Sequence, residues 1–142
     1  MIDPVALLRT LHGHAGLLAA VALLHPALTL KGPARSKGTR WSLGLSTGLA
    51  TATVIGGWLL YPGYRDGVKP RLLHEAFPLA MAFETKEHLA TFALVLAWTG
   101  CGLALGTGDR DAHRPARICY GAASALAFTV GILGSVVASA RP

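Results

Sequence analysis

The sequence predicts an all-α, polytopic membrane protein whose single domain, residues 1–142, forms four transmembrane helices in an up-down bundle. Hydrophobic residues make up 52% of the chain and charged residues 14%, whereas a soluble domain carries roughly 25% charged residues. The apolar residues gather in four long runs, each about as long as the helix that crosses roughly 30 Å of hydrocarbon. Helices are expected because a helix satisfies its own backbone hydrogen bonds in lipid.

The ends of the four expected spans are marked by caps, prolines and polar turns. Asp3 is a predicted N-cap of the first span, and Pro4 fits the first helical position, where its missing N–H is not needed. Pro62 and Gly63 are expected to end the second span. The expected spans cover residues 4–30, 41–61, 83–106 and 115–140.

The connection between the second and third spans, residues 64–83, is longer than a tight turn requires. It is partly apolar and carries Arg71, His74 and Glu75, a mixture that predicts a short interfacial segment at the membrane surface. Pro78 argues against one helix that runs unbroken from this segment into the third span.

The chain carries a formal net charge of +6, and its basic residues lie mainly between the apolar runs. Lysines and arginines in such loops fix topology and meet anionic headgroups. Because no basic and aromatic surface for stacking bases accompanies them, the lipid bilayer is the expected partner and nucleic acid is not. Residues 31–40 and 107–117 hold seven lysines and arginines, against six on the other face. This bias predicts both termini outside, in a bacterial inner membrane.

Small residues recur every four positions along the second span, at Gly44, Gly48, Ala52 and Gly56. Such a stripe lets another helix backbone approach closely in lipid. It predicts packing against a helix of the same chain, against other membrane subunits, or against a second copy in a homo-oligomer.

Histidines and acids concentrate at one end of the expected bundle. His12 and His14 lie near the start of the first span, and Glu84, Glu87 and His88 open the third. Both spans begin on the same face, so these side chains belong together, and ionisable groups near membrane depth are usually paired or functional. At 100° per residue, His12 and His14 point about 200° apart, so both are not expected to face the same interior.

A b-type haem is the first function that this pattern favours. It requires two imidazoles on facing helices, with His14 (or His12) and His88 as the expected pair. His25 is a candidate ligand for a second haem, and Arg65 and Arg71 are candidate propionate partners. The architecture resembles that of small four-helix membrane cytochromes and haem-bearing anchor subunits of respiratory enzymes. The resemblance implies a membrane subunit for electron transfer within a larger oxidoreductase, with quinol as a candidate electron donor.

Two other functions stay open. Imidazoles and carboxylates also suit a transition metal such as zinc, iron or copper, or a proton-linked membrane module. The candidate residues are His14, His88, Glu84, His74 and Glu87. The third alternative is a structural or assembly subunit of a membrane complex, with no enzymatic role, in which these groups only form a polar start to the helix.

Overall fold

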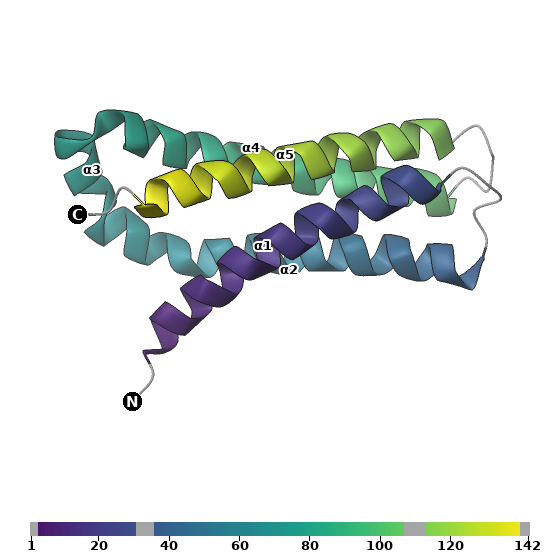
Figure 1. The fold of residues 1–142 in the computed structure, drawn as a ribbon, viewed down its shortest axis with the longest axis horizontal. Helices are drawn as coiled ribbons and strands as arrows, with labels where there is room; N and C mark the ends of the chain where they lie inside the picture. The colour runs from purple at the N-terminus through teal and green to yellow at the C-terminus, as the bar shows by residue number, and fades with distance from the viewer. Residues whose placement is uncertain (1–2, 31–35, 107–112, 140–142) are drawn as a thin grey trace.

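The computed structural model describes residues 3–30, 36–106 and 113–139, and within these ranges it contains five helices and no strand (Figure 1). Four of the helices are long and apolar enough to cross a membrane, so the predicted fold class is confirmed. The long helices are α1 (Pro4–Thr29), α2 (Lys37–Gly67), α4 (Phe77–Gly106) and α5 (His113–Ser139), and the short helix is α3 (Lys69–Glu75).

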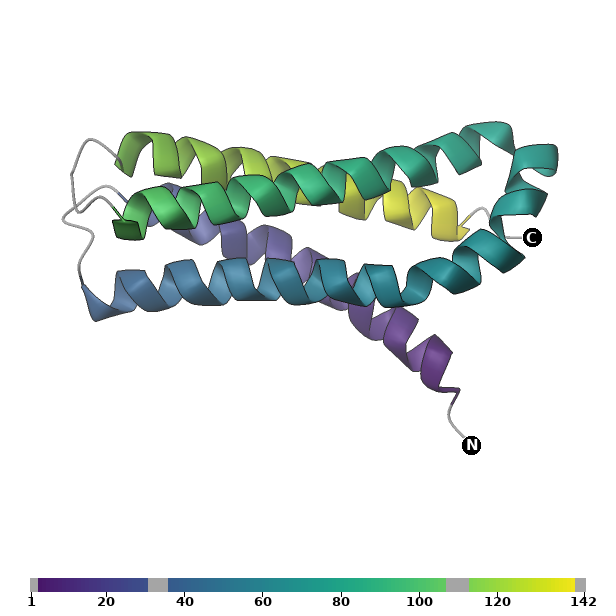
Figure 2. The same cartoon turned by 180° about the vertical axis from the view of Figure 1, so that it is seen from behind.

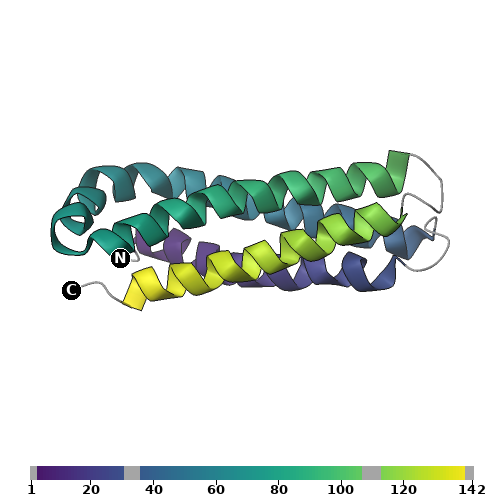
Figure 3. The same cartoon turned by 90° about the horizontal axis from the view of Figure 1, so that it is seen from above.

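The long helices form a bundle in which α1 packs against α2 and α5, and α4 packs against the same two helices. Helices α1 and α4 therefore lie across the bundle from each other. The start of α1, the end of α2, the start of α4 and the end of α5 lie at one end of the bundle, where α3 connects α2 to α4 (Figures 1, 2 and 3). We call this the α3 end. The first turns of α1 diverge from the other helices there.

The N-terminus of α1 is formed as predicted. The side chain of Asp3 accepts a hydrogen bond of 2.9 Å from the Val5 N–H, and Pro4 is the first helical residue. Pro26 lies within the last turns of α1 without ending it, since the helix continues to Thr29.

Helix α2 is longer than expected, because Pro62 does not end it. The helix continues to Gly67, and the Val68 N–H donates to the Tyr64 carbonyl at 2.9 Å. Proline within a helix removes one backbone donor, but a helix accommodates this loss where neighbouring groups satisfy the freed carbonyl. Tyr64 therefore lies within the regular part of α2, where its side chain packs against α3 and α4.

Helix α4 also begins earlier than expected, at Phe77. Pro78 lies in its first turn, where helical N–H groups have no partner within the helix, so the proline is tolerated. The backbone leaves the helical conformation at Ala76 (φ −150°, ψ 59°), which separates α3 from α4. This break agrees with the expectation from Pro78 that the connection and the third span are not one helix.

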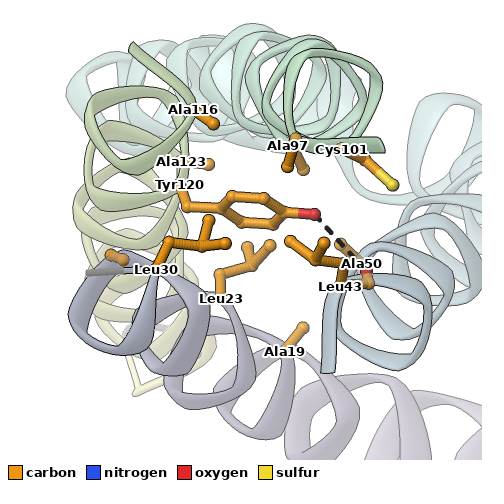
Figure 4. Close-up of a cluster of buried hydrophobic side chains, with 12 residues drawn as sticks. Ala19, Leu23, Leu30, Leu43, Ala50, Ala97, Cys101, Ala116, Tyr120 and Ala123 are labelled. Carbon is orange, nitrogen blue, oxygen red and sulfur yellow. Dashed lines mark hydrogen bonds between the residues drawn. The ribbon is translucent and has the colours of Figure 1, made fainter. Parts of the chain in front are cut away.

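The main core surrounds Tyr120 of α5, which is fully buried (Figure 4). Leucines of α1 and α2 face its ring from one side, and alanines of α4 and α5 from the other. The Tyr120 hydroxyl is 2.8 Å from Thr47 Oγ1. A Cβ atom on Gly100 would lie only 2.9 Å from the Tyr120 ring. Glycine at this position therefore permits the close approach of α4 and α5, as small residues do in membrane helices.

A second, smaller core lies at the α3 end, where α2, α3 and α4 meet. Its buried members are Tyr64, Leu72 and Ala80, one from each helix. This core holds α2, α3 and α4 together at the end of the bundle where the polar residues lie.

Candidate functional site

His12 of α1 and the ion pair Lys86–Glu87 of α4 lie within electrostatic range of one another near the α3 end, and we call these three residues the inner cluster. Lys86 Nζ donates a hydrogen bond of 3.1 Å to Glu87 Oε1. Both side chains are largely buried, with exposed fractions of 15% and 26%. Lys86 and Glu87 lie within electrostatic range of the His12 imidazole. An ion pair of α4 therefore lies within electrostatic range of an imidazole of α1.

The His12 ring packs against a pair of glycines on α2. A Cβ atom on Gly57 would lie 3.2 Å from His12 Cε1, and one on Gly56 would lie 3.4 Å from Nδ1. The Nδ1 atom is buried and has no hydrogen-bond partner among the described residues. The absence of side chains at both glycines gives the imidazole its space, so this part of α2 is shaped around His12.

A glycine of α5 makes room for Lys86 in the same way. A Cβ atom on Gly134 would lie 3.7 Å from Lys86 Cδ, in ordinary van der Waals contact with the aliphatic stem. All four long helices therefore contribute to the inner cluster: α1 and α4 supply the ionisable groups, and α2 and α5 supply the glycines against which they pack.

An aromatic pair lies beside the inner cluster. The rings of Tyr64 and Phe83 are stacked, with centroids 3.4 Å apart and planes at 11°. Lys86 Nζ lies 4.2 Å from the centroid of the Phe83 ring. The stacked phenol leaves no room on its side, so the ammonium occupies the opposite face and makes a cation–π contact. Phe83 thus separates the Tyr64 ring from the Lys86 ammonium.

A second ion pair lies nearer the surface of the α3 end, and we call it the rim pair: Lys69 and Glu84. Lys69 Nζ is 2.7 Å from Glu84 Oε1, and each side chain is 28% exposed. The hydrogen bond to Glu84 raises the pKa of Lys69, so the pair persists through neutral pH and is lost as the pH rises through that raised pKa. The pair joins the start of α3 to α4.

The two histidines expected to share a haem are not brought together within the chain. His14 is exposed on α1, and its Nδ1–H donates to the Thr10 carbonyl at 2.8 Å. His88 is exposed on α4, and its Nδ1–H donates to the Glu84 carbonyl at 2.7 Å. Because α1 and α4 lie across the bundle from each other, these two surfaces do not face one another.

Apart from His12, which packs against α2, the remaining expected haem residues are also exposed. His25 lies near the far end of α1, and its Nδ1 is 2.7 Å from Ser42 Oγ of α2. Arg65 pairs with the adjacent aspartate at 2.9 Å, and Arg71 is 3.8 Å from the glutamate one turn along α3. Each guanidinium therefore already has a carboxylate neighbour.

The five residues expected to hold a metal do not form a metal site in the part of the chain that the structure describes. His74 is exposed on α3, His14 and His88 are exposed on different helices, and Glu84 and Glu87 each pair with a lysine. Across the described ranges, no three histidine, cysteine, aspartate or glutamate side chains converge as metal ligands would.

The small-residue stripe of α2 divides into an exposed part and one glycine that contacts α1. Gly44, Gly48 and Ala52 are exposed, and a Cβ atom on either of these glycines would contact nothing within 4 Å. Gly56 instead contacts His12. The reason is geometric: residues four apart on a helix are rotated by about 40°, so the fourth member points about 120° away from the first.

Six contributors to the site were not among the expected site residues: Tyr64, Lys69, Phe83, Lys86, Gly57 and Gly134. Lys86 lies in the polar first turn of the third expected span, where a lysine side chain ordinarily points to water. The sequence therefore did not indicate that Lys86 is largely buried. The Gly56-Gly57 pair in an apolar run was a usable signal, because adjacent glycines clear two directions of a helix surface. The position of Phe83 beside Tyr64 depends on where α2 ends. Pro62 led to the expectation of an earlier end, so this contact was not predicted.

Comparisons of the chain with protein-family models, with curated proteins and with solved structures found no match. The function is therefore argued from the site. Its distinctive chemistry is an imidazole within electrostatic range of a carboxylate–ammonium pair, on helices long and apolar enough to cross a membrane. Such groups bind and release protons.

Proposed function

We propose that this protein is a proton-linked membrane module in which the inner cluster takes up and releases protons. One observation carries the proposal: the Lys86–Glu87 ion pair lies within electrostatic range of His12, and glycines of the other two helices make room for these side chains, Gly56 and Gly57 for His12 and Gly134 for Lys86. Charged groups inside membrane helices are costly, and those that persist mark proton relays and ion pathways.

Each member of the inner cluster has a distinct part. The His12 imidazole changes charge near neutral pH in water, which makes it the natural proton acceptor. The Glu87 carboxylate offers a second acceptor, and the neighbouring Lys86 ammonium reduces the cost of its negative charge. A proton that enters the cluster changes its net charge by one, and this change can be coupled to a membrane potential or to a partner subunit.

Proton flux into vesicles tests the proposal. The purified protein is reconstituted in liposomes loaded with pyranine, and a potassium gradient with valinomycin makes the interior negative. The wild-type protein should acidify the interior faster than empty vesicles do. Glu87→Gln should reduce the flux at least about tenfold, since a positioned proton-transfer group typically contributes 10²–10⁴-fold. The matched control is Glu75→Gln, an exposed glutamate on α3. Wild-type flux equal to that of empty vesicles would rule out the function.

Electron transfer through a haem b is a second proposal, supported by the orientation of two histidines. His14 and His88 are exposed, and each donates Nδ1–H to a carbonyl one turn earlier, which leaves Nε2 as the nitrogen available to a ligand. Ligating histidines usually have this arrangement. Since the two imidazoles lie on separate surfaces of one chain, another membrane subunit would have to supply the second ligand. A quinol is the corresponding candidate electron donor.

A reduced-minus-oxidised spectrum of membranes from haem-replete cells tests this second proposal. A b-type band that disappears in His14→Ala or His88→Ala would support it. A protein purified with its associated subunits and without a haem absorption would count against it, and would leave the proton-linked proposal unaffected.

The surface of Gly44, Gly48 and Ala52 supports a third proposal, packing against another membrane subunit or a second copy of the chain. We also propose the orientation that the loop charges favour, with both termini outside a bacterial inner membrane. The α3 end, and with it the inner cluster, would then face the outside.

A further inference from the structure

The two ends of the bundle differ in how their cations are neutralised. At the α3 end, four basic side chains each lie 2.7–3.8 Å from a carboxylate: Arg65, Lys69, Arg71 and Lys86. We call the other end, where α1 and α4 finish and α2 and α5 begin, the opposite end (Figure 1). Its described cations are Lys37, Arg40, Arg114 and Arg117. None of these four pairs with a carboxylate within the described ranges, whose acidic residues all lie at the α3 end.

Arg117 is the least exposed of these four cations, and the fold holds it in place. Its Nε–H donates a hydrogen bond of 3.0 Å to the Ala27 carbonyl oxygen, so the side chain reaches from α5 to α1. A guanidinium has five N–H donors, and no described residue accepts a hydrogen bond from the others. The charged group is therefore anchored at the seam between α1 and α5, with donors to spare for a ligand.

Arg114 supplies a second guanidinium on the same side of α5. It is exposed and lies three residues before Arg117, and residues three apart are neighbours on a helix surface. Exposed apolar side chains adjoin the two arginines. Ile118, four residues after Arg114, is 63% exposed, and Leu28, next to Ala27 on α1, is 56% exposed. Two cationic groups therefore border an apolar surface, an arrangement that complements a molecule with an anionic head and hydrocarbon tails.

We propose that Arg114 and Arg117 bind the headgroup phosphate of an anionic phospholipid at the seam between α1 and α5. Guanidinium groups bind phosphate oxygens through paired, charge-assisted hydrogen bonds. Basic sites between membrane helices bind anionic headgroups in this way. The lipid phosphate supplies the counter-charge that no described carboxylate provides, and its acyl chains lie along Ile118 and Leu28. A soluble anion would leave that apolar surface unused. The inference does not depend on the proton-linked function.

Native mass spectrometry of the purified protein in detergent tests the proposal. The probes are dioleoyl phosphatidylglycerol, which carries a net negative charge, and dioleoyl phosphatidylcholine, whose phosphate is balanced by its own ammonium. The wild type should bind the anionic lipid more tightly. Arg114→Gln should weaken this binding about fivefold and leave phosphatidylcholine binding unchanged. The matched control is Arg9→Gln, which removes an exposed arginine of α1 at the α3 end and should bind both lipids like the wild type.

A second variant, Arg117→Lys, keeps the positive charge and a donor for the Ala27 carbonyl but loses the fork-shaped guanidinium. It should also bind phosphatidylglycerol more weakly, with a melting temperature close to that of the wild type.

Four results would overturn the proposal. The first is equal affinity of the wild type for the two lipids, and the second is wild-type affinity for phosphatidylglycerol in Arg114→Gln. The third is an equal loss in Arg114→Gln and Arg9→Gln, which would show an effect of net charge alone. The fourth is displacement of bound phosphatidylglycerol by an equal concentration of inorganic phosphate, which would identify a soluble anion as the ligand.

Discussion

His12 and His14 are two residues apart on α1, yet their surroundings are opposite. His12 is half-buried against Gly56 and Gly57, whereas His14 is exposed and bonds to its own helix. Helical geometry predicts that the two imidazoles diverge, but it does not say which of them faces the bundle. That choice depends on the neighbouring helix, since only adjacent glycines leave space for a ring. Sequence alone therefore identified the pair of histidines but favoured His14, whereas the structure turns His12 towards α2 and leaves His14 exposed.

Gly57→Ala tests whether α2 is shaped around the imidazole. The new methyl group would lie 3.2 Å from His12 Cε1, so the ring must shift, and crowding of this kind typically costs about 1–3 kcal/mol. Gly63→Ala, on the same helix with nothing within 4 Å of its Cβ position, controls for the greater helix propensity of alanine. We expect Gly57→Ala to be less stable than Gly63→Ala by about 1 kcal/mol in thermal unfolding. Equal melting temperatures would show that His12 is not confined there.

At the scale of the elements, hydropathy predicted the four long helices but not where α2 ends and α4 begins. Both boundaries involve prolines, Pro62 and Pro78, and a proline ends a helix in some positions and is tolerated in others. The difference matters for the site, because Tyr64 faces Phe83 only if α2 continues past Pro62 and α4 starts before residue 83. Lys86 could not be assigned to the interior for the same reason.

The contact between α4 and α5 gives a prediction at this scale. In Gly100→Ala, the methyl group would lie 2.9 Å from the Tyr120 ring and 3.1 Å from the Ala116 carbonyl oxygen. Since one of these atoms belongs to the backbone, the helices must separate, and we expect a loss of about 2 kcal/mol. Gly102→Ala, with no atom within 4 Å of its Cβ position, should unfold like the wild type. Circular dichroism in detergent would measure both, and equal stability of the two variants would contradict close packing at Gly100.

At the scale of the whole molecule, the bundle is chemically asymmetric. The inner cluster, the rim pair and the buried phenol of Tyr64 all lie towards the α3 end, whereas the middle of the bundle is an alanine-rich core around Tyr120. Under the proposed proton-linked function, we expect proton exchange with the side of the membrane that the α3 end faces.

The orientation of the bundle is testable independently of its function. Loop charges predict that the α3 end and both termini lie outside. In a bacterial host, alkaline phosphatase fused after Pro142 should therefore be active, and green fluorescent protein fused there should be dark if exported unfolded. A fluorescent fusion without phosphatase activity would reverse the orientation and the side from which protons enter.

The central claim is that His12 belongs to a proton-exchanging cluster, and proton flux in vesicles that contain His12→Ala tests it most directly. The control is Thr10→Ala, an exposed residue of α1 whose hydroxyl bonds to the Ala6 carbonyl at 3.0 Å. We predict that His12→Ala lowers the flux at least about tenfold while Thr10→Ala conducts like the wild type, with both proteins folded. Full flux in folded His12→Ala would contradict the account.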